Sequence, residues 1–340
     1  MRTLTRIQVD DNSLYIPSRP STNIDIGSPG AISLVFQALL PFLLFSRPSQ
    51  SPSEPLNDDD PPSPIHLTIK GGTNVSFSPS VDYLKQVLVP TLTLIDIPPI
   101  DIKLHSRGWT TGTNKIGAIT FVVQPFAPGT TLPAFSRTDR GEITSVNATV
   151  LAPRQAERDF QREIRAALSQ TLPDVPVDVT FELSGHPKRL YLLLVVTTST
   201  GCKLGRDWLY DRRITSLSAA VAQMVTKVVD ELNQEVKSGA AVDEYMSDQL
   251  VVFQALASGS SVVNTGEDES GDRREGSLHA QTAWWVVQKL LGVDIGANGK
   301  CQGVGFVVGK TINSTSQNSA NEIDGLEKEM DKLDIKKVNV

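Results

Sequence analysis

Hydrophobic and polar positions along the chain follow two spacings, one typical of helices and one typical of strands, so the pattern predicts a fold that mixes both. The longest apolar run, residues 31–45, is 15 residues long and is broken by Gln37 and Pro41. A membrane-spanning helix needs about 20 apolar residues. The run therefore predicts a buried helix, and no membrane partner is expected.

Two more elements are predicted before residue 95. Residues 66–69 predict a short strand, which a glycine turn at Gly71 follows. Residues 79–94 have helical spacing of apolar side chains, and Ser80 and Asp82 are candidates for the N-cap.

The middle of the chain predicts a compact α/β module. Alternating apolar residues predict strands at 146–150 and 177–183, and Pro153 opens a helix between them. The continuous apolar run 190–196 predicts a strand buried on both faces, and residues 214–236 return to helical spacing. Strand, helix, strand, strand, helix is an α/β order.

The last third predicts two helices and a strand. One helix runs from near Asp243 to about Ala257, a second covers residues 282–291 after His279, and residues 303–308 predict a strand. Polar or charged segments without such spacing lie at 46–64, 264–276 and 313–340, the last with a short amphipathic helix predicted at 323–333.

Composition and net charge limit the classes of function that this protein can have. The 340 residues carry a formal net charge of −6, and the pI is about 5.3. This balance excludes a protein that coats nucleic acid through bulk electrostatics, so an RNA partner would be held at a confined site. The two cysteines, Cys202 and Cys301, are too few for a disulfide framework and lack metal-knuckle spacing. They are typical of a reducing compartment.

Three polar residues share one face of the helix predicted after Asp243. Tyr245, Asp248 and Gln249 stand at i, i+3 and i+4. An aromatic ring beside a carboxylate and an amide can stack on a nucleobase and hydrogen-bond it. The same spacing is typical of a solvated face with a half-buried tyrosine, and on spacing alone this second interpretation is favoured.

Three other groups are candidates for chemistry. His279 follows a charged loop, where an imidazole can stay accessible and neutral as a nucleophile, although a lone histidine is more often a surface or capping residue. Gln37 is an amide in an apolar helix and needs a partner in the backbone or in a ligand. The glycines at 71–72 can bring amides to an anion, but such pairs are usually turns.

Taken in order, these segments resemble the RNA 3′-terminal phosphate cyclase family, in its eukaryotic cyclase type. The specific motifs are GGTN at 71–74 with P-x-x-DY at 79–83, DEY-x-x-DQL at 243–250 and LH-x-QTA at 278–283. The resemblance covers most of the chain. Its matching stretches are residues 28–45, 66–83, 197–202, 242–259, 277–286 and 301–306.

The resemblance implies an α/β (α+β) fold. Repeated βαβαββ units would form a large domain that carries a small inserted α/β domain. The expected divisions are a divergent N-terminus at 1–24, the large domain at 25–141 and 204–311, the insert at 142–203 and a polar tail at 312–340.

The resemblance also implies an enzyme. His279 would attack the α-phosphate of ATP and carry AMP to an RNA 3′-terminal phosphate, and the adjacent 2′-hydroxyl would then displace AMP to close a 2′,3′-cyclic phosphate. ATP and Mg²⁺ are the implied cofactors, RNA 3′ ends the implied partner, and the nucleus, with some cytoplasmic presence, the implied location. The adenine and ribose contacts implied by motif match are Gln37, Pro79, Tyr245, Asp248 and Gln249, and no metal ligand is assigned.

The chain departs from the family pattern at three places. Residues 1–24 lack the family's E-G-G-G-Q segment, so we expect an incomplete gene product whose complete form is an active cyclase. Residues 106–113 keep Arg107 and Gly108 without the triple glycine, and KLGRDWLYDRR at 203–213 replaces a run of small residues.

Two alternatives compete with this interpretation. One is the non-catalytic, cyclase-like ribosome-biogenesis factor, which lacks the nucleophilic histidine, so His279 favours the enzyme. The other is an unrelated nucleotide-binding α/β enzyme, for which the chain offers neither a P-loop nor G-x-G-x-x-G.

Overall fold

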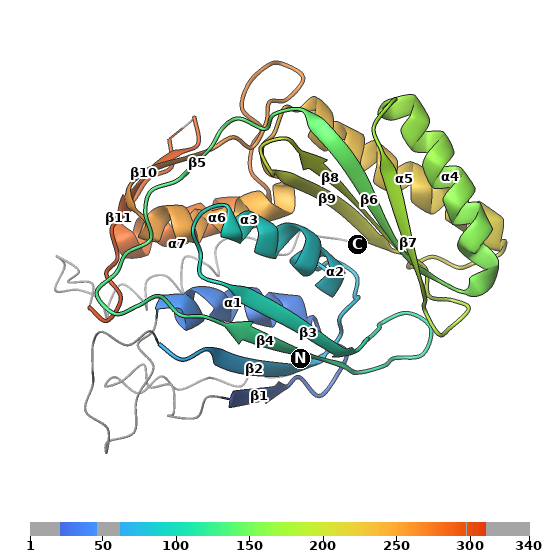
Figure 1. Ribbon diagram of the computed structural model, residues 1–340, viewed down its shortest axis with the longest axis horizontal. Coiled ribbons are helices and arrows are strands. Elements are labelled where there is room, and N and C mark those ends of the chain that lie inside the picture. Colours follow the sequence, from blue (N-terminus) through green and yellow to red (C-terminus); the bar gives the residue numbers. More distant parts are fainter. Residues whose placement is uncertain (1–20, 46–61, 297, 311–340) are drawn as a thin grey trace, which may run out of the picture. The chain divides into compact units, whose positions relative to one another are not determined.

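The computed structural model describes residues 21–45, 62–296 and 298–310. Its first part has the order β-α-β-α-β-β, which is the order of one predicted repeat unit (Figure 1). The strands form a sheet in the order β1-β2-β4-β3, with β1 parallel to β2 and β4 antiparallel to both of its neighbours. The elements are β1 (Ser21–Asp25), α1 (Ile32–Phe45), β2 (Ile65–Gly71), one helix in three parts, α2 (Val81–Tyr83), the π-helical turn η1 (Leu84–Leu88) and α3 (Val89–Thr93), then β3 (Ile100–Ser106) and β4 (Gly117–Val123).

Apolar side chains on one face of this sheet hold α1 against it. Burial alternates along β2, so that Ile65, Leu67 and Ile69 point into the core. Phe36 of α1 stacks on Phe121 of β4 with ring centroids 3.8 Å apart. Fully burying each of these side chains contributes about 1.5–3 kcal/mol. The apolar run 31–45 is thus a buried helix, as predicted.

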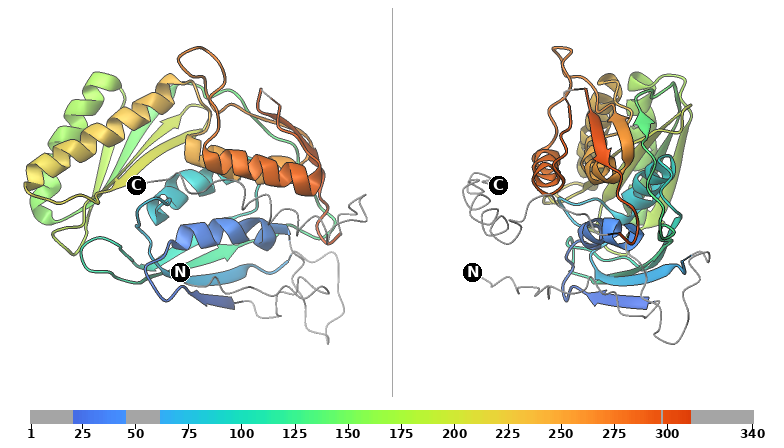
Figure 2. Two further views of the ribbon diagram at one scale, coloured as in Figure 1. Left: turned by 180° about the vertical axis from the view of Figure 1, so that it is seen from behind. Right: turned by 90° about the vertical axis from the view of Figure 1, so that its left-hand side faces the viewer.

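A second four-stranded sheet follows, in the order β7-β6-β8-β9. Strands β6 and β7 are parallel, while β8 is antiparallel to both β6 and β9. Helices α4 and α5 cover one face of the sheet (Figure 2, left). The elements are β6 (Ile143–Ala152), η2 (Arg154–Ala156), α4 (Glu157–Thr171), β7 (Val177–Leu183), β8 (Tyr191–Thr198), β9 (Lys203–Leu209) and α5 (Leu217–Lys237).

Strand β8 is buried on both faces, as its continuous apolar run predicted. Leu192 and Leu194 pack in the core beneath α4 and α5, whereas Leu193 and Val195 pack in the core that also contains α1 and α2–α3. The second sheet therefore shares a core with the first sheet, and the described residues up to Gly309 form one compact unit. Since β9 is the last strand of this sheet and α5 packs on its face, the second sheet extends past residue 203. The domain boundaries stay a prediction.

The remaining elements form a second, partial repeat with the three-stranded sheet β11-β10-β5. Strand β10 is parallel to β5 and antiparallel to β11. The elements are β5 (Ser136–Arg137), α6 (Glu244–Leu256), β10 (Ser258–Val263), α7 (Leu278–Leu291) and β11 (Lys300–Val304). The mixed helices and strands confirm the predicted α/β class.

Two predicted elements are wrong in their limits. Helix α7 begins at Leu278 rather than at residue 282, because Ser277 caps it by accepting a hydrogen bond from the Ala280 N–H. Strand β11 covers Lys300–Val304 rather than residues 303–308. It ends at Val304 because the next residue, Gly305, turns the chain at φ 64°. Most of the predicted loop 46–64, the N-terminal residues 1–20 and the predicted helix at 323–333 lie outside the described residues.

Candidate active site

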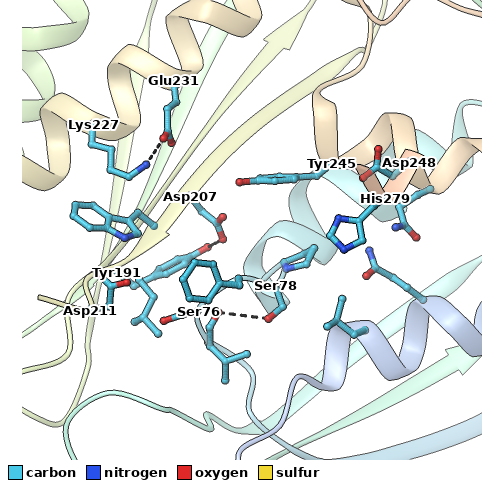
Figure 3. A pocket seen from close by; sticks show the side chains of 18 residues that line it. Ser76, Ser78, Tyr191, Asp207, Asp211, Lys227, Glu231, Tyr245, Asp248 and His279 are labelled. Carbon is cyan, nitrogen blue, oxygen red and sulfur yellow. Dashed lines mark hydrogen bonds and ion pairs between the residues drawn. The ribbon is translucent and has the colours of Figure 1, made fainter. Parts of the chain in front are cut away.

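A cavity of about 470 Å³ lies where α1, the loop before α2, the edge of the second sheet, α5, α6 and the start of α7 converge (Figure 3). All six residues that the sequence singled out line it: Gln37, Pro79, Tyr245, Asp248, Gln249 and His279. They come from four separate segments of the chain. The fold thus brings the whole predicted set together, and their individual roles stay predictions.

Helix α6 supplies three of these residues from one face. Its N-cap, Asp243, is fully buried and accepts hydrogen bonds from the Met246 N–H at 2.9 Å, the Tyr83 hydroxyl at 2.6 Å and the Gly205 N–H at 2.7 Å. Asp243 therefore joins the start of α6 to α2 and β9. These hydrogen bonds fix the start of α6 and so set the direction in which Tyr245 points.

Tyr245 offers a flat surface to the cavity. The ring meets Tyr83 edge-on with centroids 5.8 Å apart, and the Arg206 guanidinium lies 4.7 Å from its centroid. These two neighbours restrain the ring, while part of it lines the cavity. A restrained aromatic surface of this kind can stack on a planar ligand.

His279 lies in the first turn of α7, beside Asp248 of α6. The Ser277 hydroxyl donates to the Asp248 carboxylate at 2.8 Å while it accepts from the Ala280 N–H at 3.1 Å. Burial raises the pKa of Asp248, and the Ser277 hydrogen bond and the nearby His279 oppose this rise. The imidazole is exposed and makes no hydrogen bond with other described residues. A ring nitrogen is therefore accessible from the cavity for attack on an electrophile.

Gln37 is buried in α1 with 9% of its surface exposed, and its Nε2 atom has no hydrogen-bond partner among the described residues. Leaving such a donor unpaired costs about 1–3 kcal/mol. Because Gln37 lines the cavity, a bound molecule with an acceptor atom is the partner that would recover this cost.

We expect Gln37→Leu to raise the free energy of unfolding by about 1 kcal/mol, since leucine removes the unpaired donor at nearly constant volume. The same change should weaken binding of ATP, the ligand that the sequence motifs imply, about tenfold. Thermal melting and a binding titration would measure the two effects. The matched control is Gln86→Leu, which loses a 2.9 Å hydrogen bond to Thr149 and should lower stability without changing the affinity for the implied ATP. Equal behaviour of both variants would contradict the prediction.

Several residues of the cavity were not singled out from the sequence. They are Leu34, Val75, Ser76, Phe77, Ser78, Tyr191, Asp207, Trp208, Leu209, Asp211, Lys227 and Glu231. Four of them belong to the segment 203–213. The departure of this segment from the family pattern is the sequence feature that could have pointed to these four residues. Among these, Asp207 accepts a hydrogen bond from the Tyr191 hydroxyl at 2.9 Å, and that hydroxyl lies 2.5 Å from the Ser80 oxygen. Burial raises the pKa of Asp207 from 3.8 to about 6, although the Tyr191 hydrogen bond and the nearby Ser80 hydroxyl lower it.

Asp207 should make the protein less stable as the pH rises from about 4 to about 6. Its pKa is higher in the folded chain than in the unfolded one, so in this window the folded state binds more protons and loses stability with rising pH. Asp207→Asn should therefore have a smaller fall in melting temperature over this range than the wild type. An unchanged slope would contradict this, and the exposed Asp230→Asn is the control.

The glycine turn at 71–72 is structural. The Gly72 N–H donates to the Gly30 carbonyl, and the N–H groups of Thr73 and Asn74 donate to the Gly108 carbonyl. A Cβ atom on Gly72 would lie 2.4 Å from the Pro29 carbonyl oxygen. The close backbone packing requires glycine here, and these amides are already in use, so the turn does not hold an anion in this arrangement.

Among the residues in the described ranges, no three His, Cys, Asp or Glu side chains gather as ligands for one metal ion. None of the helices that the structure describes is both long and apolar enough to cross a bilayer.

The chain is similar to known proteins over most of its length. A family model described as RNA 3′-terminal phosphate cyclase matches residues 6–297. The RNA 3′-terminal phosphate cyclase of Pyrobaculum neutrophilum is 30% identical over 276 residues, covering 80% of this chain and 69% of that protein. Proteins of the same name from Pyrococcus furiosus and Drosophila melanogaster are 30% and 26% identical, each covering 79% of this chain and 68% of its own length.

The chain belongs to the RNA 3′-terminal phosphate cyclase family. This confirms the resemblance drawn from the GGTN, DEY-x-x-DQL and LH-x-QTA motifs.

Proposed function

We propose that this protein uses ATP to convert an RNA 3′-terminal phosphate into a 2′,3′-cyclic phosphate, through AMP carried on His279. The observation that carries the proposal is the convergence of His279, Tyr245, Asp248, Gln249, Gln37 and Pro79 on one cavity. The family supports the cyclase reaction itself.

The first step would be nucleotidyl transfer to His279. A neutral ring nitrogen attacks the α-phosphorus of ATP, the bond to the β-phosphate oxygen breaks, and pyrophosphate leaves. The adenine would stack between Tyr245 and Pro79, while the unpaired Gln37 amide and the Asp248 carboxylate bind polar groups of the nucleotide. Asp248 also holds Ser277, so it would position α7 and thereby the imidazole.

The second and third steps would use the stored AMP. An oxygen of the RNA 3′-phosphate attacks the phosphorus, the N–P bond breaks, and an RNA-adenylate forms. The 2′-hydroxyl then attacks the terminal phosphate, loses its proton to solvent and releases AMP. Two transfers replace a poor leaving group with AMP, which is the benefit of covalent catalysis here.

Mg²⁺ would supply charge neutralisation at the phosphates. This ion commonly binds through substrate phosphates and one or two carboxylates rather than in a protein cage. Among the carboxylates that line the cavity, Asp248 is the nearest to His279 in the amino-acid sequence. We also propose a nuclear location, with some cytoplasmic presence, which the family resemblance implies; the two free cysteines agree with either reducing compartment.

The test is a reaction of the purified chain with ATP labelled at the α-phosphate, Mg²⁺ and an RNA oligonucleotide ending in a 3′-phosphate. We expect acid-labile label on the protein before RNA is added, and conversion of the RNA end to a phosphatase-resistant cyclic phosphate afterwards. Label without RNA conversion would contradict the cyclase reaction. A folded protein that neither takes label nor converts RNA would favour the non-catalytic relative.

A further inference from the structure

One end of the cavity contains residues that the proposed reaction does not use. Besides Asp207, this end is lined by Lys227 and Glu231, which are paired to each other (Figure 3). Trp208 also lines the cavity here, with its ring centroid 5.3 Å from Lys227 Nζ. Figure 3 shows Asp207 below the hydroxyl end of Tyr245 and His279 below the opposite end of the same side chain. The two residues therefore lie toward opposite ends of the aromatic surface.

Asp207 has a fixed position and a free acceptor atom. Its Oδ2 atom is held by the Tyr191 hydroxyl, which is buried and in turn contacts the buried Ser80. No hydrogen bond joins its Oδ1 atom to another described residue. Burial raises the pKa of Tyr245, the Arg206 charge lowers it, and the Asp207 charge adds to the rise, as expected of close neighbours. A carboxylate oxygen that is held rigidly and lines a cavity can select a ligand that offers a donor.

The edge of a purine carries such a distinction. Adenine has an amino group at position 6, which donates, whereas guanine and hypoxanthine have an oxygen there, which accepts. A nucleotide with its α-phosphate at His279 and its base on Tyr245 would direct the edge of the base that is farthest from the phosphate toward Asp207. An acceptor at this place attracts an amino group and repels a carbonyl oxygen.

We propose that Asp207 determines the base specificity of the nucleotide site, by accepting a hydrogen bond from the 6-amino group of adenine and rejecting 6-oxopurines. This proposal rests on the proposed function, since it assumes that the α-phosphate lies at His279. It assigns the selection of ATP to a residue of β9, on the second sheet, rather than to the α6 and α7 motifs.

Binding of ATP, ITP and GTP tests the proposal. The three dissociation constants are measured by titration of tryptophan fluorescence, in a His279→Ala background that keeps binding reversible. With Asp207 present we expect ATP to bind at least tenfold more tightly than ITP or GTP. ITP is the decisive comparison, because it differs from ATP at position 6 and carries no 2-amino group.

Asp207→Asn should reduce or reverse this preference. The asparagine carbonyl can still accept from Tyr191, which directs its amide N–H₂ group toward the cavity, where it donates to a 6-oxygen and opposes a 6-amino group. We expect the ATP-to-ITP ratio to fall at least tenfold. Asp207→Ala removes the acceptor without adding a donor and should bring the ratio toward one. Asp230→Asn removes the same charge from an exposed position on α5 and should preserve the preference.

The outcomes separate this proposal from the proposed function. If the wild type takes label from α-labelled ATP but ATP and ITP bind equally, base selection by Asp207 is overturned while the cyclase chemistry stands. The same holds if both Asp207 variants are folded and keep the wild-type ratio, or if GTP binds best. If no nucleotide binds or labels the folded protein, both proposals fail.

Discussion

Replacing His279 with alanine is expected to abolish covalent labelling by α-labelled ATP and to lower RNA cyclisation by at least a thousandfold. The imidazole is exposed in the cavity and is the accessible nitrogen nucleophile in the first turn of α7. Covalent catalysis cannot proceed without its nucleophile, so the loss should appear in the rate of transfer. ATP binding should change much less, since Tyr245, Gln37 and Gln249 remain.

His66→Ala is the matched control for this experiment. His66 is an exposed histidine on β2 and does not line the cavity, so its replacement should leave labelling unchanged. Retention of acid-labile label by a folded His279→Ala protein would exclude His279 as the AMP carrier. Loss of label in both variants would point to a general failure of folding, which circular dichroism would detect.

Replacing Asp243 with alanine should have the largest effect on stability. It removes the N-cap of α6, which costs about 1 kcal/mol. It also leaves the Tyr83 hydroxyl and the Gly205 N–H without their buried acceptor, at about 1–3 kcal/mol each. Burial raises the pKa of Asp243 to about 6, so removing the carboxylate returns part of this cost at neutral pH. We expect a net loss of about 3 kcal/mol, measured by urea denaturation.

The consequences of Asp243→Ala should reach the site. Because Asp243 joins α6 to α2 and β9, its loss should loosen Tyr245 and Asp248 and weaken nucleotide binding as well. Ser216→Ala is the matched control, since Ser216 caps α5 from an exposed position and accepts only from the Ala219 N–H. It should cost about 1 kcal/mol or less. Equal losses in the two variants would show that the buried network around Asp243 contributes nothing beyond a cap.

Much of the local structure was predictable because its causes are local. Helical spacing placed Tyr245, Asp248 and Gln249 on one face of α6, and they do line the cavity together. The continuous apolar run of β8 indicated burial on both faces, which the two cores confirm. The limits of α7 and β11 were less predictable, since they depend on the Ser277 cap and on the turn at Gly305.

The amino-acid sequence was enough to predict many of the helices and strands with regular apolar spacing, the α/β class and, through its motifs, which polar residues would meet at a site. These features depend on neighbours within a few residues or on patterns that the family shares. Which residues lie opposite those polar residues in the cavity follows from the tertiary fold and not from the sequence pattern. Asp207 comes from β9 and is held by Tyr191 of β8, while the Gln37 amide is left unpaired by the packing around α1. Such contacts join segments far apart in the chain, and no local spacing encodes them.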